Sequence, residues 1–182
     1  MILFVNACVR KESRTKRLAE ALLAKLDDEI TEVKLEDIDF TITNEGFLAK
    51  RDALIMAGKF DDESFALARQ FAEADTIVIA APYWDLSFPA TLKQYIENIN
   101  VLGITFEYTP EGMPKGRCKA KKLYYVTTAG GTYVPDEFGY GYIKTLAKDF
   151  YGIVDVELIK ATGFDVYGES PEAILEKACK EL

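Results

Sequence analysis

Three short segments of this 182-residue sequence carry residue types that could hold a ligand. The first runs from Asn6 to Thr15, ends in Ser13, Arg14 and Thr15, and continues into a segment with helical periodicity. A helix start offers free N–H groups and the positive end of the helix dipole, which together attract anions. We therefore expect this segment to bind a phosphate monoester. The alternative is that Ser13 acts only as a helix cap.

The second segment, Ala81 to Pro89, places aromatic side chains between two prolines. The prolines fix the backbone, and aromatic residues after a strand provide a surface against which a flat ring could lie. Tyr83, Trp84 and Phe88 could each also be a core or interface residue. This segment alone therefore leaves the ring-binding and the structural interpretations open.

The third segment, Thr127 to Tyr133, contains the pair Gly130-Gly131. Consecutive glycines let backbone N–H groups approach a ligand closely, although such turns are common after strands. Each of the three segments is a weak signal by itself. The hypothesis that they form one ligand site requires that the fold bring all three together.

The composition excludes several kinds of chemistry. Histidine is absent, which rules out Ser-His-Asp and Cys-His catalysis and histidine metal ligands. Cys8, Cys118 and Cys179 lie far apart without metal-binding spacing, so we expect neither a metal site nor a disulfide framework. With 22 basic and 30 acidic residues, a net charge of −8 argues against nucleic acid as a partner.

The N-terminal and apolar segments bear on the location of the protein. The run from Met1 to Ala7 lacks the basic region and the length of a signal peptide. No stretch approaches the length that spans a membrane. We therefore expect a cytoplasmic protein without a membrane partner.

Apolar runs of strand length alternate with segments of helical period, as in α/β proteins. The expected strands are Ile2–Val5, Ile30–Leu35, Thr76–Ala81, Leu123–Thr128 and Ile153–Ile159. This alternation predicts a single domain over residues 1–182 with a flavodoxin-like three-layer fold. Its five-stranded parallel sheet would have the order 2-1-3-4-5 and helices on both faces. Ligands of such sheets bind beyond the carboxyl ends of the strands, beside strand one, where the three segments would meet.

Two connections are longer than this fold requires. Between the second and third strands we expect an extra helix around Gly46–Met56, followed by a helix over Asp61–Ala74. The stretch Gly103–Lys119, rich in proline and glycine, indicates a hairpin or flap before the fourth strand. Such additions suggest a substrate pocket rather than a bare carrier fold.

The three segments resemble the NAD(P)H-dependent FMN oxidoreductases of flavodoxin-like fold, most closely their azoreductase and quinone reductase branch. The resemblance covers nearly the whole chain and is strongest from Ala81 to Tyr133. There APYWDLSFPATLKQYIENI is similar to the family's Pro-x-x-x-Phe-x-x-Pro-x-x-Leu-Lys segment, continued by Gly103–Phe106 and by TTAGG. It implies FMN as cofactor and hydride transfer from NADH or NADPH, via flavin N5, to quinone, azo or similar aromatic acceptors. It also implies a homodimer with active sites at the subunit interface.

The resemblance assigns cofactor-binding roles by position. The residues implied at the FMN phosphate are Ser13, Arg14 and Thr15. Those implied along the ribityl chain and ring are Pro82, Tyr83, Trp84, Asp85 and Leu86. Those implied at the opposite edge are Thr128, Ala129, Gly130, Gly131 and Tyr133. FMN carries the chemistry, so no catalytic residue is expected beyond Tyr133 or Tyr83 as a proton donor. Gly46–Phe60 is the segment expected to cover the partner subunit's flavin.

Two positions depart from the family pattern. Asp85 stands where asparagine is expected, and Ala129 stands where arginine is frequent. A carboxylate near the flavin would lower its potential or repel an anionic acceptor. These departures bear on the acceptor more than on the cofactor.

The first segment also allows a rival hypothesis, because Cys8, five residues and Arg14-Thr15 have the spacing of a Cys-x5-Arg phosphatase loop. A Cys8 thiolate would attack phosphorus while Arg14 held the oxygens, as in low-molecular-weight tyrosine phosphatases. The loop lacks a glycine, and Asp165 precedes Val166 rather than the proline of a general-acid segment. This hypothesis also leaves the second and third segments unexplained.

Two further alternatives share the topology. A flavodoxin-type electron carrier would be similarly acidic, but it would need neither the Gly103–Lys119 flap nor the long second crossover. A phospho-receiver domain would carry paired acids after the first strand, where this chain has Asn6-Ala7.

Overall fold

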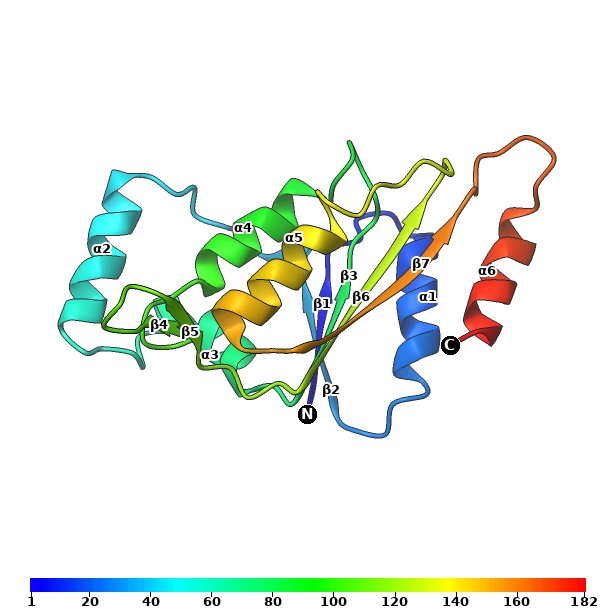
Figure 1. Cartoon of the computed structure of the whole chain (residues 1–182). Coiled ribbons are helices and arrows are strands. Elements are labelled where there is room, and N and C mark those ends of the chain that lie inside the picture. Colours follow the sequence, from blue (N-terminus) through cyan, green and yellow to red (C-terminus); the bar gives the residue numbers. More distant parts are fainter.

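The computed structural model describes residues 1–182 and contains one five-stranded parallel sheet (Figure 1). The strand order is β2-β1-β3-β6-β7, which is the predicted order 2-1-3-4-5 once the short hairpin strands are set aside. The strands are β1 (Ile2–Asn6), β2 (Ile30–Lys34), β3 (Thr76–Ala80), β6 (Lys122–Ala129) and β7 (Asp155–Thr162). The predicted flavodoxin-like α/β architecture is therefore confirmed.

Helices cover both faces of the sheet. They are α1 (Arg14–Leu23), α2 (Glu45–Met56), α3 (Ala66–Glu73), α4 (Ala90–Ile99), α5 (Tyr140–Thr145) and α6 (Pro171–Lys180). Three short helical turns accompany them: η1 (Leu35–Asp37), η2 (Glu63–Phe65) and the π-helix η3 (Leu146–Tyr151). Helices α1 and α6 lie side by side on one face, and α3, α4 and α5 cover the other (Figure 1).

The alternation of side chains along each strand divides the core in two. Ile2 and Phe4 of β1 pack against Leu18 and Leu22 of α1, whereas Leu3 points to the opposite face. The opposite cluster is the larger and includes Phe71, Leu92, Tyr95 and Ile143 from the covering helices. All five residues of β1 are buried, as expected for a central strand covered on both faces.

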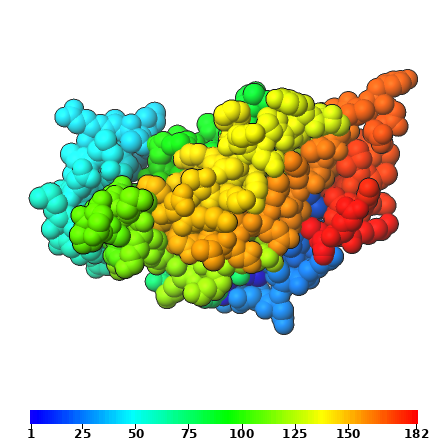
Figure 2. All heavy atoms as spheres, in the orientation of Figure 1, coloured from blue at the N-terminus to red at the C-terminus, as the bar shows by residue number.

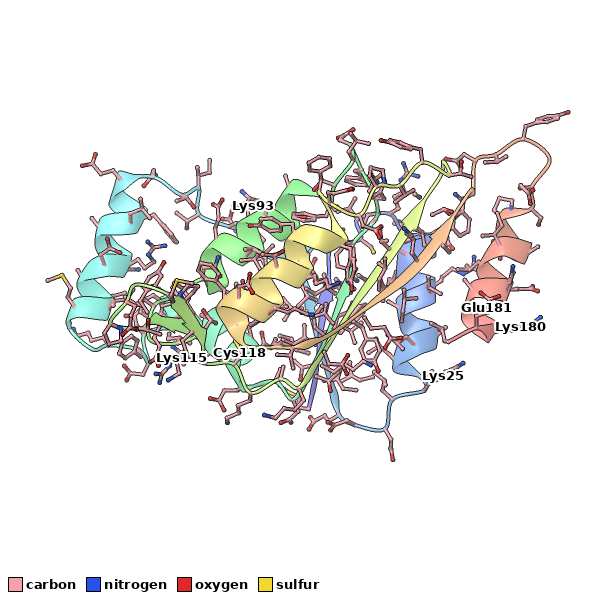
Figure 3. All side chains as sticks on the ribbon, viewed as in Figure 1. Lys25, Lys93, Lys115, Cys118, Lys180 and Glu181 are labelled. Atoms are coloured by element: carbon pink, nitrogen blue, oxygen red, sulfur yellow. The ribbon has the colours of Figure 1, made fainter.

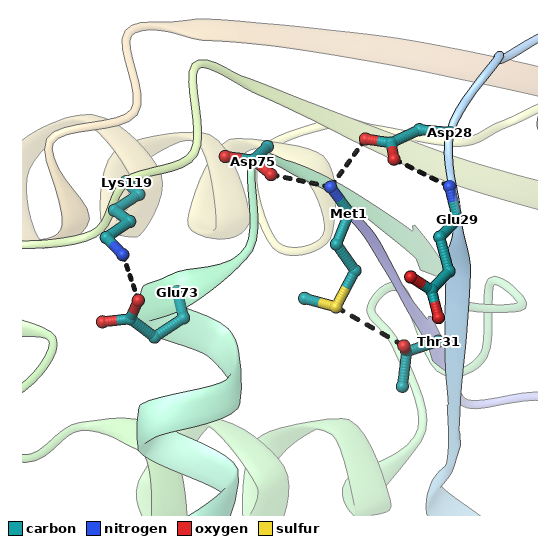
Figure 4. A network of polar contacts seen from close by, with 7 residues as sticks. All are labelled: Met1, Asp28, Glu29, Thr31, Glu73, Asp75 and Lys119. Atoms are coloured by element: carbon teal, nitrogen blue, oxygen red, sulfur yellow. Dashed lines mark hydrogen bonds and ion pairs between the residues drawn. The ribbon is translucent and has the colours of Figure 1, made fainter.

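Polar contacts link the chain just before β1, β2 and β3 at the amino-terminal edge of the sheet (Figure 4). The amino group of Met1 lies 2.6 Å from a carboxylate oxygen of Asp28 and 2.7 Å from one of Asp75. These ion pairs raise the pKa of the amino group. Nearby, Lys119 pairs with Glu73 at the end of α3.

The long connections form the predicted additions. Helix α2 begins at Glu45, capped by the Asn44 side chain, and none of its residues is buried. Figures 1 and 2 show it at the end of the molecule opposite α6. The stretch Gly103–Lys119 contains the antiparallel hairpin of β4 (Phe106–Tyr108) and β5 (Pro114–Gly116).

Hairpin strand β5 packs closely against η3. A Cβ atom on Gly116 would lie 2.1 Å from the backbone nitrogen of Gly152, which ends η3 with a φ of 77°. Cys118 lies beside the hairpin, shortly after β5 (Figure 3). Its thiol donates to the Thr105 carbonyl oxygen at 3.6 Å. All three cysteines are free thiols.

The elements differ from expectation at several boundaries. The helix expected over Asp61–Ala74 begins only at Ala66, because Asp62 caps the separate turn η2 and Phe65 is buried. The last strand begins at Asp155 rather than Ile153 and continues to Thr162, since it pairs with β6 as far as Ala129. No helix is long and apolar enough to span a membrane.

Candidate functional site

The loops after β1, β3 and β6 enclose a cavity of about 270 Å³ at the carboxyl edge of the sheet. Residues of all three predicted segments line it. The predicted residues among them are Ser13, Arg14, Thr15, Pro82, Tyr83, Trp84, Thr128, Ala129 and Gly130. The parallel register of β1, β3 and β6 produces this convergence, because their carboxyl ends fall at one edge.

The first loop delivers hydroxyl groups to the start of α1. Ser13 is the N-cap residue, and its hydroxyl oxygen accepts a hydrogen bond of 3.2 Å from the Lys16 backbone N–H. Ser13 is thus a helix cap and a cavity residue at once. Its hydroxyl hydrogen remains available to an anion, as do the orphan N–H groups of the first turn.

Thr15 connects α1 to the carboxyl end of β6. Its hydroxyl oxygen lies 2.6 Å from that of Thr128, and either can donate. Thr15 is 1% exposed and Thr128 is 8% exposed. A pair of hydroxyls uses one hydrogen between them, so one hydrogen remains for a ligand. This donor set fits the oxygens of a phosphate monoester.

Arg14 lies at the rim of the same end of the cavity. Its guanidinium carbon is 5.1 Å from the centre of the Phe164 ring. One guanidinium nitrogen is 3.3 Å from a carboxylate oxygen of Asp165. Arg14 therefore lines the same cavity as Ser13 and Thr15.

The second loop continues beyond β3 as an aromatic wall. The Tyr83 backbone N–H donates to the Thr128 carbonyl oxygen at 3.0 Å, which fixes this loop against β6. The Tyr83 hydroxyl donates to the Pro135 carbonyl oxygen at 3.4 Å. Partial burial, with the nearby Tyr133 and acidic side chains, raises the pKa of the Tyr83 phenol. The phenol therefore keeps its proton at neutral pH.

A tight turn follows this wall. Trp84 and Ser87 exchange backbone hydrogen bonds of 3.0 and 2.7 Å across Asp85 and Leu86. Both central residues have positive φ, 51° and 66°, a conformation that is strained for leucine. Non-glycine residues in this conformation cluster at functional sites. Trp84 lines the cavity at the base of this turn, while Asp85 and Leu86 lie at its exposed tip.

Four of the predicted residues do not line the cavity: Asp85, Leu86, Gly131 and Tyr133. Tyr133 is 78% exposed, and Leu86 is 47% exposed. They lie on loops that border the cavity, so contact with a ligand within this chain alone would require the ligand to extend over the rim.

Five lining residues were not predicted: Val9, Arg10, Glu12, Phe164 and Asp165. The first three belong to the predicted first loop, where charged side chains gave no distinctive pattern. Phe164 and Asp165 follow β7. The one available signal was that the fifth parallel strand also ends at this edge of the sheet.

Cys8, the nucleophile of the phosphatase hypothesis, is not among the residues that line the cavity. It is 5% exposed, and its thiol faces the Ala80 carbonyl oxygen at 3.8 Å. Burial raises the pKa of the Cys8 thiol to about 11. A thiolate nucleophile, as the phosphatase hypothesis requires, is therefore not formed at neutral pH.

Comparison with known proteins gives one consistent family. A family model described as having a flavodoxin-like fold matches residues 1–182. A Clostridium perfringens protein named FMN-dependent NADH:quinone oxidoreductase is 36% identical, over 99% of this chain and 94% of its own length. A protein of the same name from Clostridium beijerinckii is 38% identical, over 97% of this chain and 93% of its own length.

Solved structures agree with this assignment. A crystal structure of azoreductase from Bacillus anthracis str. Sterne superposes with a TM-score of 0.83 at 28% identity, covering 99% of this chain and 95% of the other. An FMN-dependent NADH-azoreductase from Bacillus anthracis str. Ames Ancestor, in complex with FMN, gives a TM-score of 0.79 at 25% identity. That comparison covers 99% of this chain and 94% of the other.

Proposed function

The chain belongs to the flavodoxin-like family of FMN-dependent NADH:quinone oxidoreductases, and on this basis we propose that it uses FMN to reduce quinone or azo compounds with NADH. FMN, when bound, supplies the chemistry by accepting a hydride from the nicotinamide and giving it up to the acceptor. The observation that carries the proposal is one cavity that joins an anion-binding helix start to an aromatic wall.

The residues of the cavity divide the binding of FMN between them. Ser13, Thr15 and the first turn of α1 would hold the phosphate, with Arg14 beside it. Pro82, Tyr83 and Trp84 would orient the flat ring, and the backbone of Gly130 would approach its opposite edge. A cavity of about 270 Å³ encloses only part of a cofactor of this size, so the ring would extend toward Gly131 and Tyr133 at the rim.

Tyr83 and Tyr133 are the side chains that could pass a proton to the acceptor. The raised pKa of Tyr83 keeps a hydrogen on its phenol, and Tyr133 is exposed at the rim. The Asp85 carboxylate at the tip of its turn would disfavour anionic acceptors. An uncharged quinone is therefore the acceptor class that this rim suits best.

A homodimer in the cytoplasm completes the proposal. Exposed aromatic residues lie at the cavity, with Trp84 lining it at 36% exposure and Tyr133 on the adjoining loop at 78% exposure. Helix α2 buries none of its own residues and exposes Met56 to 89%. A second copy that places Gly46–Phe60 over this rim would bury both surfaces and exclude water from the ring.

The rival functions are less well supported. A phosphatase requires an ionised Cys8, which burial disfavours. A pure electron carrier does not account for relatives that are named as oxidoreductases.

The experiment that tests the proposal is reconstitution followed by turnover. Apoprotein titrated with FMN should bind it stoichiometrically. Under anaerobic conditions the loaded protein should then oxidise NADH beyond one equivalent of its flavin only when a quinone is added. Cys8→Ser should retain this activity, and aryl phosphate hydrolysis should stay at background. A chain that binds no FMN, or that hydrolyses the phosphate ester instead, would overturn the proposal.

A further inference from the structure

Phe164 and Asp165 form a wall of the cavity that comes from the end of β7, outside the three loops that suggested the site. Phe164 is 3% exposed, so its ring is a fixed platform. Asp165 is held by its backbone, whose N–H donates to the Gly130 carbonyl oxygen at 2.9 Å. Both residues line the same cavity as Ser13 and Thr15.

The Asp165 carboxylate occupies a place that only a glycine at position 130 can leave free. A Cβ atom on Gly130 would lie 2.0 Å from one carboxylate oxygen of Asp165 and 2.8 Å from its carboxyl carbon. The carboxylate thus rests directly on the backbone of the third loop. Its other oxygen, 3.3 Å from the Arg14 guanidinium, faces the first loop.

Arg14 needs such a partner, because it is the first residue of α1. The positive end of the helix dipole disfavours a cation at that position. Stacking on Phe164 at 5.1 Å and pairing with Asp165 hold the partly exposed guanidinium at the rim of the cavity. Asp165 therefore connects the first loop to the third loop, through Arg14 on one side and Gly130 on the other.

We propose that Asp165 is a positioning residue for the cofactor phosphate: it holds the Arg14 guanidinium over Phe164, so that the phosphate is captured between this guanidinium and the start of α1. This inference rests on the proposed function, because the phosphate is that of FMN. The carboxylate contributes orientation and not direct attraction, since its own charge repels the phosphate. The benefit of Asp165 therefore exists only while Arg14 is present.

The test compares the affinity of apoprotein for FMN and for riboflavin, which lacks the phosphate. Asp165→Asn should weaken FMN binding by roughly two- to fivefold, the scale of a solvent-exposed ion pair, and leave riboflavin binding unchanged. Glu172→Gln is the matched control. This substitution breaks an ion pair between Glu172 and Arg17, which is also on α1. The two nitrogen-oxygen distances of that pair are 2.9 and 2.8 Å, and neither residue lines the cavity.

A double-mutant cycle separates positioning from direct repulsion. In an Arg14→Met background, Asp165→Asn should no longer weaken FMN binding. The inference is overturned if Asp165→Asn binds FMN as well as or better than the unaltered chain, if riboflavin is affected equally, or if the loss persists without Arg14. If the unaltered chain binds no FMN, the proposed function itself fails, which is a separate and recognisable outcome.

Discussion

Ser13 and Thr15 are the side chains on which the proposed phosphate site depends most directly. Each has a hydroxyl at the start of α1, and Thr15 is almost fully buried against Thr128. A buried hydroxyl that meets a charged oxygen gains more than an exposed one, because little water competes for it.

We predict that the double variant Ser13→Ala, Thr15→Ala weakens FMN binding by about 1–3 kcal/mol, the scale of lost hydrogen bonds to a charged group. Fluorescence titration of apoprotein with FMN measures this, and riboflavin binding should change far less. Ser170→Ala is a fitting control, because it removes the N-cap of α6, whose oxygen accepts from the Ala173 N–H at 3.3 Å. Equal FMN retention in the double variant and the control would refute the phosphate assignment.

Cys8 gives a prediction about pH. Its folded pKa is raised by burial to about 11, from an ordinary value of 9.0. Between these values the folded chain keeps a proton that the unfolded chain loses, so the free energy of unfolding falls as pH rises. For one such thiol the slope approaches about 1.4 kcal/mol per pH unit.

Urea unfolding on either side of about pH 9 measures this loss of stability. In Cys8→Ala the free energy of unfolding should fall less steeply with pH. Part of the slope should remain, because burial also raises the pKa of Cys118, to about 12. An identical slope in the variant would show that Cys8 does not titrate as described.

At the scale of elements, the contact between β5 and η3 shows how the hairpin is held. The backbones of Gly116 and Gly152 touch, and no side chain fits between them. We predict that Gly116→Ala lowers the free energy of unfolding by about 1–3 kcal/mol, the usual cost of overpacking. Gly131→Ala, whose Cβ atom would meet nothing within 4 Å, serves as the control in the same thermal or urea unfolding experiment. Equal stability of the two variants would contradict the described packing.

The elements also show how far the sequence could be interpreted. The strands, their order, α2 and the hairpin were predicted correctly, because buried parallel strands and proline-glycine turns have strong local patterns. The start of α3 was missed because the Asp62 cap begins a separate turn. Phe164 and Asp165 were missed as cavity residues because their contacts with Arg14 and Gly130 are long-range and leave no local pattern.

At the scale of the whole molecule, helix α2 and the aromatic residues at the rim of the cavity are exposed surfaces that a second copy could cover. That one domain spans residues 1–182 stays a prediction, as does the dimer. The sequence suggested Gly46–Phe60 as a cover for a partner's flavin only by family resemblance. Within one copy, α2 lies at the end of the molecule away from α6 (Figure 2).

We predict that light scattering gives about twice the chain mass of 20.4 kDa. Met56→Asp should shift the protein toward monomer, because it places a charge on the apolar surface of α2 that a second copy would bury. Tyr167→Asp, at a fully exposed position after β7, should leave the mass unchanged. A monomeric mass for the unaltered chain would rule out the dimer and the covering role of Gly46–Phe60.

Hydride transfer from a nicotinamide to FMN, bound in the cavity of Ser13, Thr15 and Tyr83, is the central step of the proposed activity. The most direct measurement is an anaerobic titration of the FMN-reconstituted protein with NADH, followed by flavin absorbance. We predict that one equivalent of NADH bleaches one equivalent of bound flavin and that added quinone restores the colour. Bound flavin that stays oxidised in excess NADH would contradict the proposed activity.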